Sequence, residues 1–255
     1  MNTPPHNRIV VTGRAREAVI AVQKLILFVA RYWYLFVLGL TWLVLLLGLL
    51  APTLLALGLP DAAEWCYETL APHNHQLPQR SYFLFGEAGI IRTYPVEQLI
   101  EQGADPLNLQ AFTGNAEIGY KTALNHRMLA IFGAMLVGGL GWGLTKGRPR
   151  INAVGLLLLA LPLLIDGLSH MVSEDSGLGF RATNAWAIAL TGGALAPEFY
   201  TGTTVGTLNW WLRTVTGGLF GLGLVWFLCS YLSARFAPIR AKLEPKLRRA
   251  RVTNT

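Results

Sequence analysis

Four stretches of the sequence are apolar, nearly free of charge and long enough to cross a lipid bilayer. They cover residues 32–58, 128–145, 151–172 and 208–234. About 20 residues of α-helix, at about 1.5 Å per residue, cross the ~30 Å hydrocarbon core of a bilayer. Because lipid offers the backbone no hydrogen-bond partners, each stretch must form a helix to satisfy its own polar groups. The sequence therefore predicts an all-α membrane protein with four transmembrane helices.

The composition excludes several other classes of protein. Of the 255 residues, 53% are hydrophobic and only 14% are charged, which is typical of a membrane protein and not of a disordered chain. Two cysteines, Cys66 and Cys229, are too few for a disulfide-stapled domain, and we expect them at opposite faces of the membrane, where they cannot pair. The first apolar stretch far exceeds the roughly 7 to 15 residues of a signal-peptide core, so we expect it to remain in the mature protein.

The basic residues predict the orientation of the spans. Of the 21 lysine and arginine residues, fifteen fall before the first span, between the second and third spans, or after the fourth. Because positively charged segments stay in the cytoplasm, we expect residues 1–31 and the basic tail 235–255 inside, and two structured outer loops at 59–127 and 173–207. These features predict a single multi-pass membrane domain. The net charge of +7 thus indicates topology and not nucleic-acid binding, because no groove of interleaved aromatic and basic residues accompanies it.

Short patterns predict helices within the outer loops. Residues 61–70 form an amphipathic pattern, and residues 95–103 begin with proline and end with glycine, which is typical punctuation for a helix of two or three turns. Asn115 is expected to cap a helix that continues into the second span. A further surface helix is expected around residues 180–189.

Glycine pairs four residues apart predict close contacts between helices. Gly139 and Gly143 form one such pair in the second span, and Gly217 and Gly221 form another in the fourth. Small residues at this spacing let two helix backbones approach each other. Packing within the bundle and dimerisation both explain the pattern.

Two ionisable residues lie deep in the third predicted span. Asp166 and His170 are four residues apart, so they share one face of the helix. Ionisable groups at this depth are costly unless they are paired or face water. A pair between Asp166 and either Arg127 or Arg213 would satisfy both charges. One interpretation is therefore a structural ion pair that fixes the register of the helices.

A second interpretation is a metal or haem site at the outer end of the bundle. Neutral imidazoles together with a carboxylate are a reasonable ligand set for zinc or iron. The histidines at this end are His73, His75, His126 and His170. His170 alone could also be the axial ligand of a haem or chlorin.

A third interpretation is a site for an acidic headgroup. Guanidinium groups bind phosphate and carboxylate through paired hydrogen bonds. The basic residues expected at the outer end are Arg80, Lys121, Arg127 and Arg213. An acid and base pair of Asp166 with His170 is also conceivable, although no nucleophile motif accompanies it.

Four motifs of the sequence resemble those of one bacterial family. They are His-Gln-Leu-Pro-Gln-Arg-Ser at 75–81, the arginine Arg127 that opens the second span, Leu-Pro-Leu-Leu-Ile-Asp-Gly at 161–167, and Asn-Trp-Trp-Leu-Arg-Thr-Val-Thr-Gly-Gly-Leu-Phe-Gly at 209–221. In this order they resemble the polytopic membrane proteins grouped as the domain of unknown function number 2085. The resemblance implies that this chain lies in the bacterial cytoplasmic (inner) membrane. The family pattern has cysteines where this chain has Asn74, Asn125 and Met128.

The resemblance implies that the residues matching its motifs meet in space. With His170, added for its depth in the membrane, the expected polar cluster comprises His75, Gln76, Arg80, Ser81, Arg127, Asp166, His170, Asn209 and Arg213. The resemblance implies no activity, because the family has none assigned. Because its three thiols are absent here, a metal site built on sulfur is not expected in this chain.

Two classes of function follow from these features. The first is a non-catalytic accessory or assembly subunit of a larger membrane complex, with other membrane protein subunits as partners. The alternative is a self-contained enzyme or transporter that binds a lipid headgroup or a metal at an outward-facing polar site. The expected ligands are accordingly membrane lipids or a metal ion, with no nucleic acid and no assigned cofactor.

Overall fold

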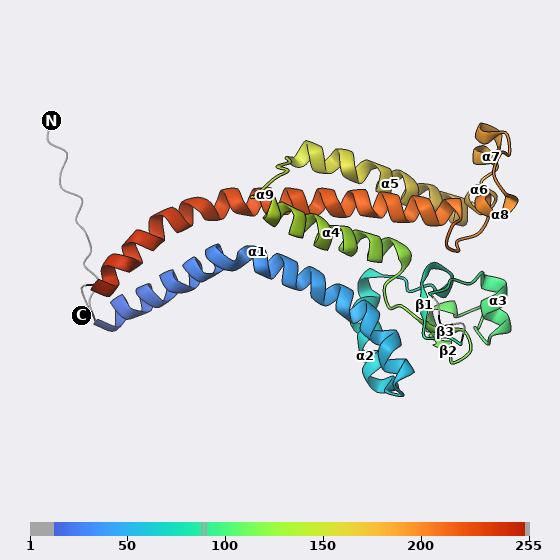
Figure 1. Ribbon diagram of the computed structural model, residues 1–255, viewed down its shortest axis with the longest axis horizontal. Coiled ribbons are helices and arrows are strands. Elements are labelled where there is room, and N and C mark those ends of the chain that lie inside the picture. The colour runs from blue at the N-terminus through green and yellow to red at the C-terminus, as the bar shows by residue number, and fades with distance from the viewer. Residues whose placement is uncertain (1–12, 88, 90, 253–255) are drawn as a thin grey trace. The chain divides into compact units, whose positions relative to one another are not determined.

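Four long apolar helices dominate the computed structural model, which describes residues 13–87, 89 and 91–252 (Figure 1). They are α1 (Gly13–Ala56), α4 (His126–Leu144), α5 (Ala153–Asp175) and α9 (Leu208–Val252). Each is long and apolar enough to cross a membrane. The prediction of an all-α membrane protein with four transmembrane helices is therefore confirmed.

The chain divides into two compact units, which are described separately. The terminal unit comprises the described residues 13–37 and 231–252, and the main unit comprises residues 38–230. Helices α1 and α9 contribute to both units, because each continues well beyond the length that a bilayer requires: α1 has 44 residues and α9 has 45. The described parts of the segments that flank the first and fourth predicted spans are thus helical.

Within the main unit, α9 packs against α4 and α5 through glycines (Figure 1). A Cβ atom on Gly221 would lie 2.2 Å from the carbonyl oxygen of Ile131 in α4. A Cβ atom on Gly223 would lie 2.9 Å from the Leu159 side chain in α5. The backbones of α9 and α4 can approach this closely only because Gly221 has no side chain. The glycine pair in the fourth span therefore serves packing within the chain.

A proline in α1 leaves a backbone carbonyl free to accept a hydrogen bond from the segment before α4. Pro52 has no backbone N–H group, so the carbonyl of Gly48, four residues earlier, lacks its helical partner. The backbone N–H of Ala123 donates to that carbonyl at 3.0 Å. Around this contact the ends of α1 and α2 (Pro60–Leu70) form a core with the segment before α4. Its buried residues are Ala51, Ala63, Cys66, Tyr67, Leu70, Ala123 and Leu124.

The connection between α1 and α4 is a small folded layer. After α2 it contains the 3-10 turns η1 (Ala71–His73), η2 (Pro78–Arg80) and η3 (Leu109–Ala111), the helix α3 (Val96–Glu101), and the strands β1 (Phe83–Leu84), β2 (Gly114–Asn115) and β3 (Gly119–Lys121). The strands form an antiparallel sheet in the order β1-β3-β2, in which Phe83 pairs with Lys121. This layer has its own core, which consists of Phe83, Tyr94, Leu99, Ala104 and Ile118. Helices α2 and α3 occupy the two segments for which the sequence predicts loop helices.

The predicted helix from Asn115 into the second span is wrong. Asn115 ends β2, and Gly119 opens β3 with a φ of +87°. A Cβ atom at Gly119 would lie 2.4 Å from the carbonyl oxygen of Leu84, so the glycine allows the strands to pair closely. Helix α4 begins instead at His126, where the Asn125 side chain accepts a hydrogen bond from the backbone N–H of Met128 at 3.0 Å.

The connection between α5 and α9 contains three short helices. They are α6 (Phe180–Thr183), α7 (Ala185–Thr191) and α8 (Pro197–Tyr200). The single surface helix expected around residues 180–189 is divided at Asn184, whose φ of +46° is not helical. The buried Asn184 side chain donates to the carbonyl of Tyr200 at 2.6 Å and so ties the three helices together.

Candidate functional site

Asp166 is the centre of a buried cluster of arginine side chains in the main unit. Its side chain comes from α5 and is only 4% exposed. Arg127, in the first turn of α4, donates to its Oδ2 atom at 2.6 Å. Arg181, in α6, donates to its Oδ1 atom at 2.6 Å. Each carboxylate oxygen therefore binds a guanidinium group from a different element, and the carboxylate joins α4, α5 and α6.

His170 lies one turn after Asp166 on the same face of α5. Its Nε2 atom is 3.0 Å from Nη2 of Arg181 and 3.3 Å from Nη2 of Arg213. A guanidinium group can only donate hydrogen bonds, so Nε2 must be the acceptor. The His170 ring is then neutral, with its proton on Nδ1. Asp166 and His170 both act as acceptors for arginines in this arrangement, which does not make them an acid and base pair.

Arg213, from the first turns of α9, is the least satisfied charge in this cluster. Its side chain is 3% exposed, and its Nη1 atom is buried without a hydrogen-bond partner. Within the described ranges, no carboxylate lies within ion-pair distance of it. Arg80, from η2, forms an ion pair with Glu174 of α5. Arg213 therefore has a neutral histidine where its three neighbouring arginines each have a carboxylate.

The cluster carries a surplus of positive charge. Four arginines face the ion-paired carboxylates of Asp166 and Glu174, and Glu97 lines the same cavity as Arg80 and Arg213. The formal surplus is therefore one positive charge. Burial lowers the pKa of the Arg181 guanidinium, and its ion pair with Asp166 only partly offsets that effect. A buried surplus of this kind is costly unless an anion neutralises it.

Two cavities adjoin the unsatisfied arginine. The larger has a volume of about 500 Å³ and is lined by residues that include His170, Glu174 and Arg181. The smaller has a volume of about 200 Å³ and is lined by residues that include His75 and Arg127. Arg80 and Arg213 line both. Four guanidinium groups are thus accessible from one cavity or the other.

The structure brings together most of the residues that the sequence predicts. Arg80, Arg127, Asp166, His170, Asn209 and Arg213 all belong to this cluster or its cavities. Asn209 has a positioning role, because its amide donates to the carbonyls of Arg181 and Gly202, each at 2.9 Å. His75 is exposed and lines only the smaller cavity.

Gln76 and Ser81 serve the loop and not the cluster. The Gln76 amide donates to the carbonyl of Tyr67 at 2.8 Å, and the Ser81 hydroxyl donates to the carbonyl of Leu77 at 3.0 Å. These bonds fix the turn that carries Arg80. The two residues therefore position the site from outside it.

Of the four histidines considered as metal ligands, the three with described side chains do not gather. His126 is buried with its ring 4.3 Å from the Tyr82 ring, between centroids, while His75 is exposed and His170 binds two arginines. The side chain of His73 lies outside the described residues. Across the part of the chain that the structure describes, no three histidine, cysteine, aspartate or glutamate side chains are grouped so as to hold a metal ion.

Lys121 lies away from the arginine cluster. It is 0% exposed, and its ammonium group donates to the carbonyls of Gln76 at 2.9 Å and Gln110 at 2.6 Å. It lines a third cavity, of about 400 Å³, together with Tyr67 and Glu68. Burial lowers its pKa from 10.5 to about 7. Its role is to hold the folded layer together.

Two residues of the cluster, Arg181 and Glu174, are not predicted from the sequence. Arg181 and Glu174 belong to no recognised motif, and Arg181 falls in a segment expected to form a surface helix. The available signal is that Arg181 is the sole lysine or arginine between Asp166 and Arg213. An isolated charge in a connection rich in glycine and threonine is a candidate for pairing with a buried carboxylate.

The three positions at which the resemblance expects cysteine adjoin one another. Asn74, Asn125 and Met128 all line the smaller cavity. The Asn125 amide donates to Oδ1 of Asn74 at 2.6 Å, and the Asn74 amide donates to the carbonyl of Ala123 at 2.6 Å. A chain of amide hydrogen bonds thus occupies the place where the family pattern has thiols.

Comparisons with known proteins add no assignment to this geometry. A scan against protein-family models, a search of curated proteins and a search of solved structures find no match for the chain. The arrangement of charges and cavities is therefore the basis for a proposed function.

Proposed function

We propose that this multi-pass membrane protein binds an acidic group, a carboxylate or a phosphate, in the arginine cluster. The observation that carries the proposal is Arg213. Its guanidinium group is buried, and among the described residues it has no carboxylate partner and no hydrogen-bond partner for Nη1. The residue lines both cavities. Uncompensated charges at such depth mark binding sites more often than they persist unpaired.

The chemistry of the site favours an anion over a metal. The groups that face the two cavities include four guanidiniums, which bind carboxylate and phosphate oxygens through paired donors. A metal cation would instead meet the formal surplus of one positive charge described above. The headgroup interpretation of the sequence is thus better supported than the metal interpretation.

We further propose that the cluster faces the outside of a bacterial inner membrane, with both chain ends in the cytoplasm. The distribution of lysine and arginine supports this orientation, because the basic segments are the first 31 residues, which include the start of α1, the connection between α4 and α5, and the end of α9. The acidic ligand would then come from the outer leaflet or from the outer compartment.

Native mass spectrometry of the protein, extracted from its own membrane in mild detergent, tests the proposal. We expect the mass of the chain plus a reproducible acidic adduct. Arg213→Gln should lose the adduct. Arg92→Gln removes the same charge but should keep the adduct, because Arg92 is exposed in the first connection. An adduct-free wild-type chain, or equal adduct loss in both variants, would contradict the proposal.

The same spectra test the prediction of an accessory subunit. Recovery of the chain only within a larger assembly would support that prediction, and the neighbouring subunits would then be identified by their masses. If the acidic adduct is present in such an assembly, the two proposals are compatible. If the assembly contains no adduct, the acidic-ligand proposal fails.

A further inference from the structure

The terminal unit is far more basic than the rest of the chain. Its described residues include eleven lysine and arginine residues against two glutamates, which gives a formal charge of +9. The basic residues are Arg14, Arg16, Lys24, Arg31, Arg235, Arg240, Lys242, Lys246, Arg248, Arg249 and Arg251. The main unit contributes nothing to this excess, because it has nine basic and twelve acidic residues.

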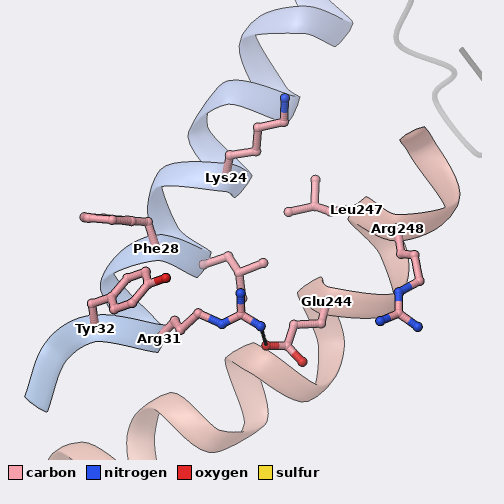
Figure 2. A pocket seen from close by; sticks show the side chains of 8 residues that line it. Lys24, Phe28, Arg31, Tyr32, Glu244, Leu247 and Arg248 are labelled. Atoms are coloured by element: carbon pink, nitrogen blue, oxygen red, sulfur yellow. Dashed lines mark hydrogen bonds and ion pairs between the residues drawn. The ribbon is translucent and has the colours of Figure 1, made fainter. Parts of the chain in front are cut away.

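A cavity lies inside the terminal unit, between the helical segments of α1 and α9 (Figure 2). Its volume is about 540 Å³. The residues that line it are Lys24, Leu27, Phe28, Arg31, Tyr32, Glu244, Leu247 and Arg248. One wall therefore combines cations with aliphatic and aromatic side chains.

Among the described residues, one of the three cations in this cavity has a carboxylate partner. Arg31 donates to Glu244 at 3.4 Å (Figure 2). Lys24 and Arg248 have no such ion pair within the described residues. The lining thus has a net charge of +2, and the two unpaired cations come from opposite helices.

An apolar face of α1 continues from the cavity. Phe28 lines the cavity and is 50% exposed, and Val22, Leu25, Ile26 and Val29 on the same helix segment are between 37% and 62% exposed. Apolar residues that are exposed in a continuous row next to cations are typical of a helix that lies at a lipid headgroup boundary. The row is long enough to contact an acyl chain.

We propose that the terminal unit binds an anionic phospholipid, with its phosphate at the cations that line the cavity and an acyl chain along the exposed face of α1. Charge complementarity requires an anion, and the adjoining apolar row requires that the anion carry a hydrocarbon chain. An acidic peptide would satisfy the cations but would leave Val22, Leu25 and Val29 uncovered. The site is separate from the arginine cluster of the main unit and does not depend on the function proposed for it.

Titration of the delipidated full-length protein with phosphatidylglycerol or phosphatidylcholine, followed by native mass spectrometry, tests this site. We expect at least one phosphatidylglycerol to bind more tightly than phosphatidylcholine. The double variant Lys24→Gln with Arg248→Gln should weaken that binding roughly tenfold, because each basic residue near a membrane surface contributes appreciably to anionic lipid affinity. Arg92→Gln, at an exposed residue of the main unit, should leave it unchanged.

The matched control is Arg14→Gln with Lys242→Gln, which removes the same charge from the terminal unit without touching the cavity. The control should retain tight phosphatidylglycerol binding. Equal weakening in both double variants would overturn the proposal, because the charge would then act diffusely. Absence of a phosphatidylglycerol preference, or binding of a polyglutamate peptide in its place, would also overturn it.

Discussion

Each oxygen of the Asp166 carboxylate neutralises one guanidinium group, from Arg127 and from Arg181. Asp166→Asn keeps the size of the side chain but leaves the buried Arg181 and the half-buried Arg127 without a carboxylate. Removing one partner of a buried ion pair costs about 3–5 kcal/mol. We expect a loss of stability of this order, measured by thermal unfolding in detergent.

The double variant Asp166→Asn with Arg181→Gln is the control for this effect. It removes one of the stranded charges, so it should recover part of the stability that Asp166→Asn loses. If the double variant is as unstable as the sum of the two single variants, Asp166 and Arg181 do not stabilise each other as the structure indicates.

Lys121 should make the stability of the fold depend on pH. Burial lowers its pKa from 10.5 to about 7, so between these values the unfolded chain binds a proton that the folded chain does not. The contribution of Lys121 to stability therefore rises with pH across this window, by about 1 kcal/mol per pH unit, and is least favourable below pH 7. The difference in Tm between wild type and Lys121→Met should shift in favour of wild type from pH 7 to pH 9.5. A constant difference would show that Lys121 is not a titrating buried amine.

At the scale of helices, Gly221 sets the distance between α9 and α4. Gly221→Ala would place a methyl group 2.2 Å from a backbone oxygen of α4, and Gly218→Ala, on the same helix, would meet no atom within 4 Å. Overpacking of this kind costs about 1–3 kcal/mol. We expect a clear drop in Tm for Gly221→Ala and none for Gly218→Ala. Identical melting of the two variants would mean that α9 and α4 are not packed through this glycine.

The elements were predictable to different degrees. The four spans follow from hydropathy alone, because the bilayer fixes their length. The strands β2 and β3 do not, since they have five residues together, are rich in glycine and depend on the pairing of β3 with β1 and β2, which no local pattern shows. For the same reason Asn115 is misread as a helix cap, whereas Asn125 is the residue that caps α4.

The polar site was predictable in part, for a physical reason. Ionisable residues inside apolar segments are costly, so depth alone identifies Asp166, His170 and Arg213. Arg181 lies outside any apolar segment, and only the tertiary fold of α6 brings it to Asp166. For Lys121 the prediction differs in the other direction. The sequence groups it with the arginines of the acidic-headgroup site, but its ammonium group donates to two backbone carbonyls of the folded layer between α1 and α4.

For the whole molecule, the distribution of charge separates two kinds of basic site. The terminal unit has a large overall excess of positive charge, whereas the main unit has a formal charge of −3, from nine basic and twelve acidic residues. The arginine cluster is therefore a local surplus within an acidic unit and not a by-product of a basic chain. Such a local surplus, kept at depth against its cost, is the strongest indication of a binding site.

The most direct test of that claim is a cryo-electron microscopy map of the protein in nanodiscs made with its native lipids. We predict density for a non-protein group within hydrogen-bond distance of Nη1 of Arg213, in one of the two cavities beside it. A map that shows both cavities without such density, and Nη1 bonded to a protein carbonyl, would contradict the assignment of an acidic-ligand site.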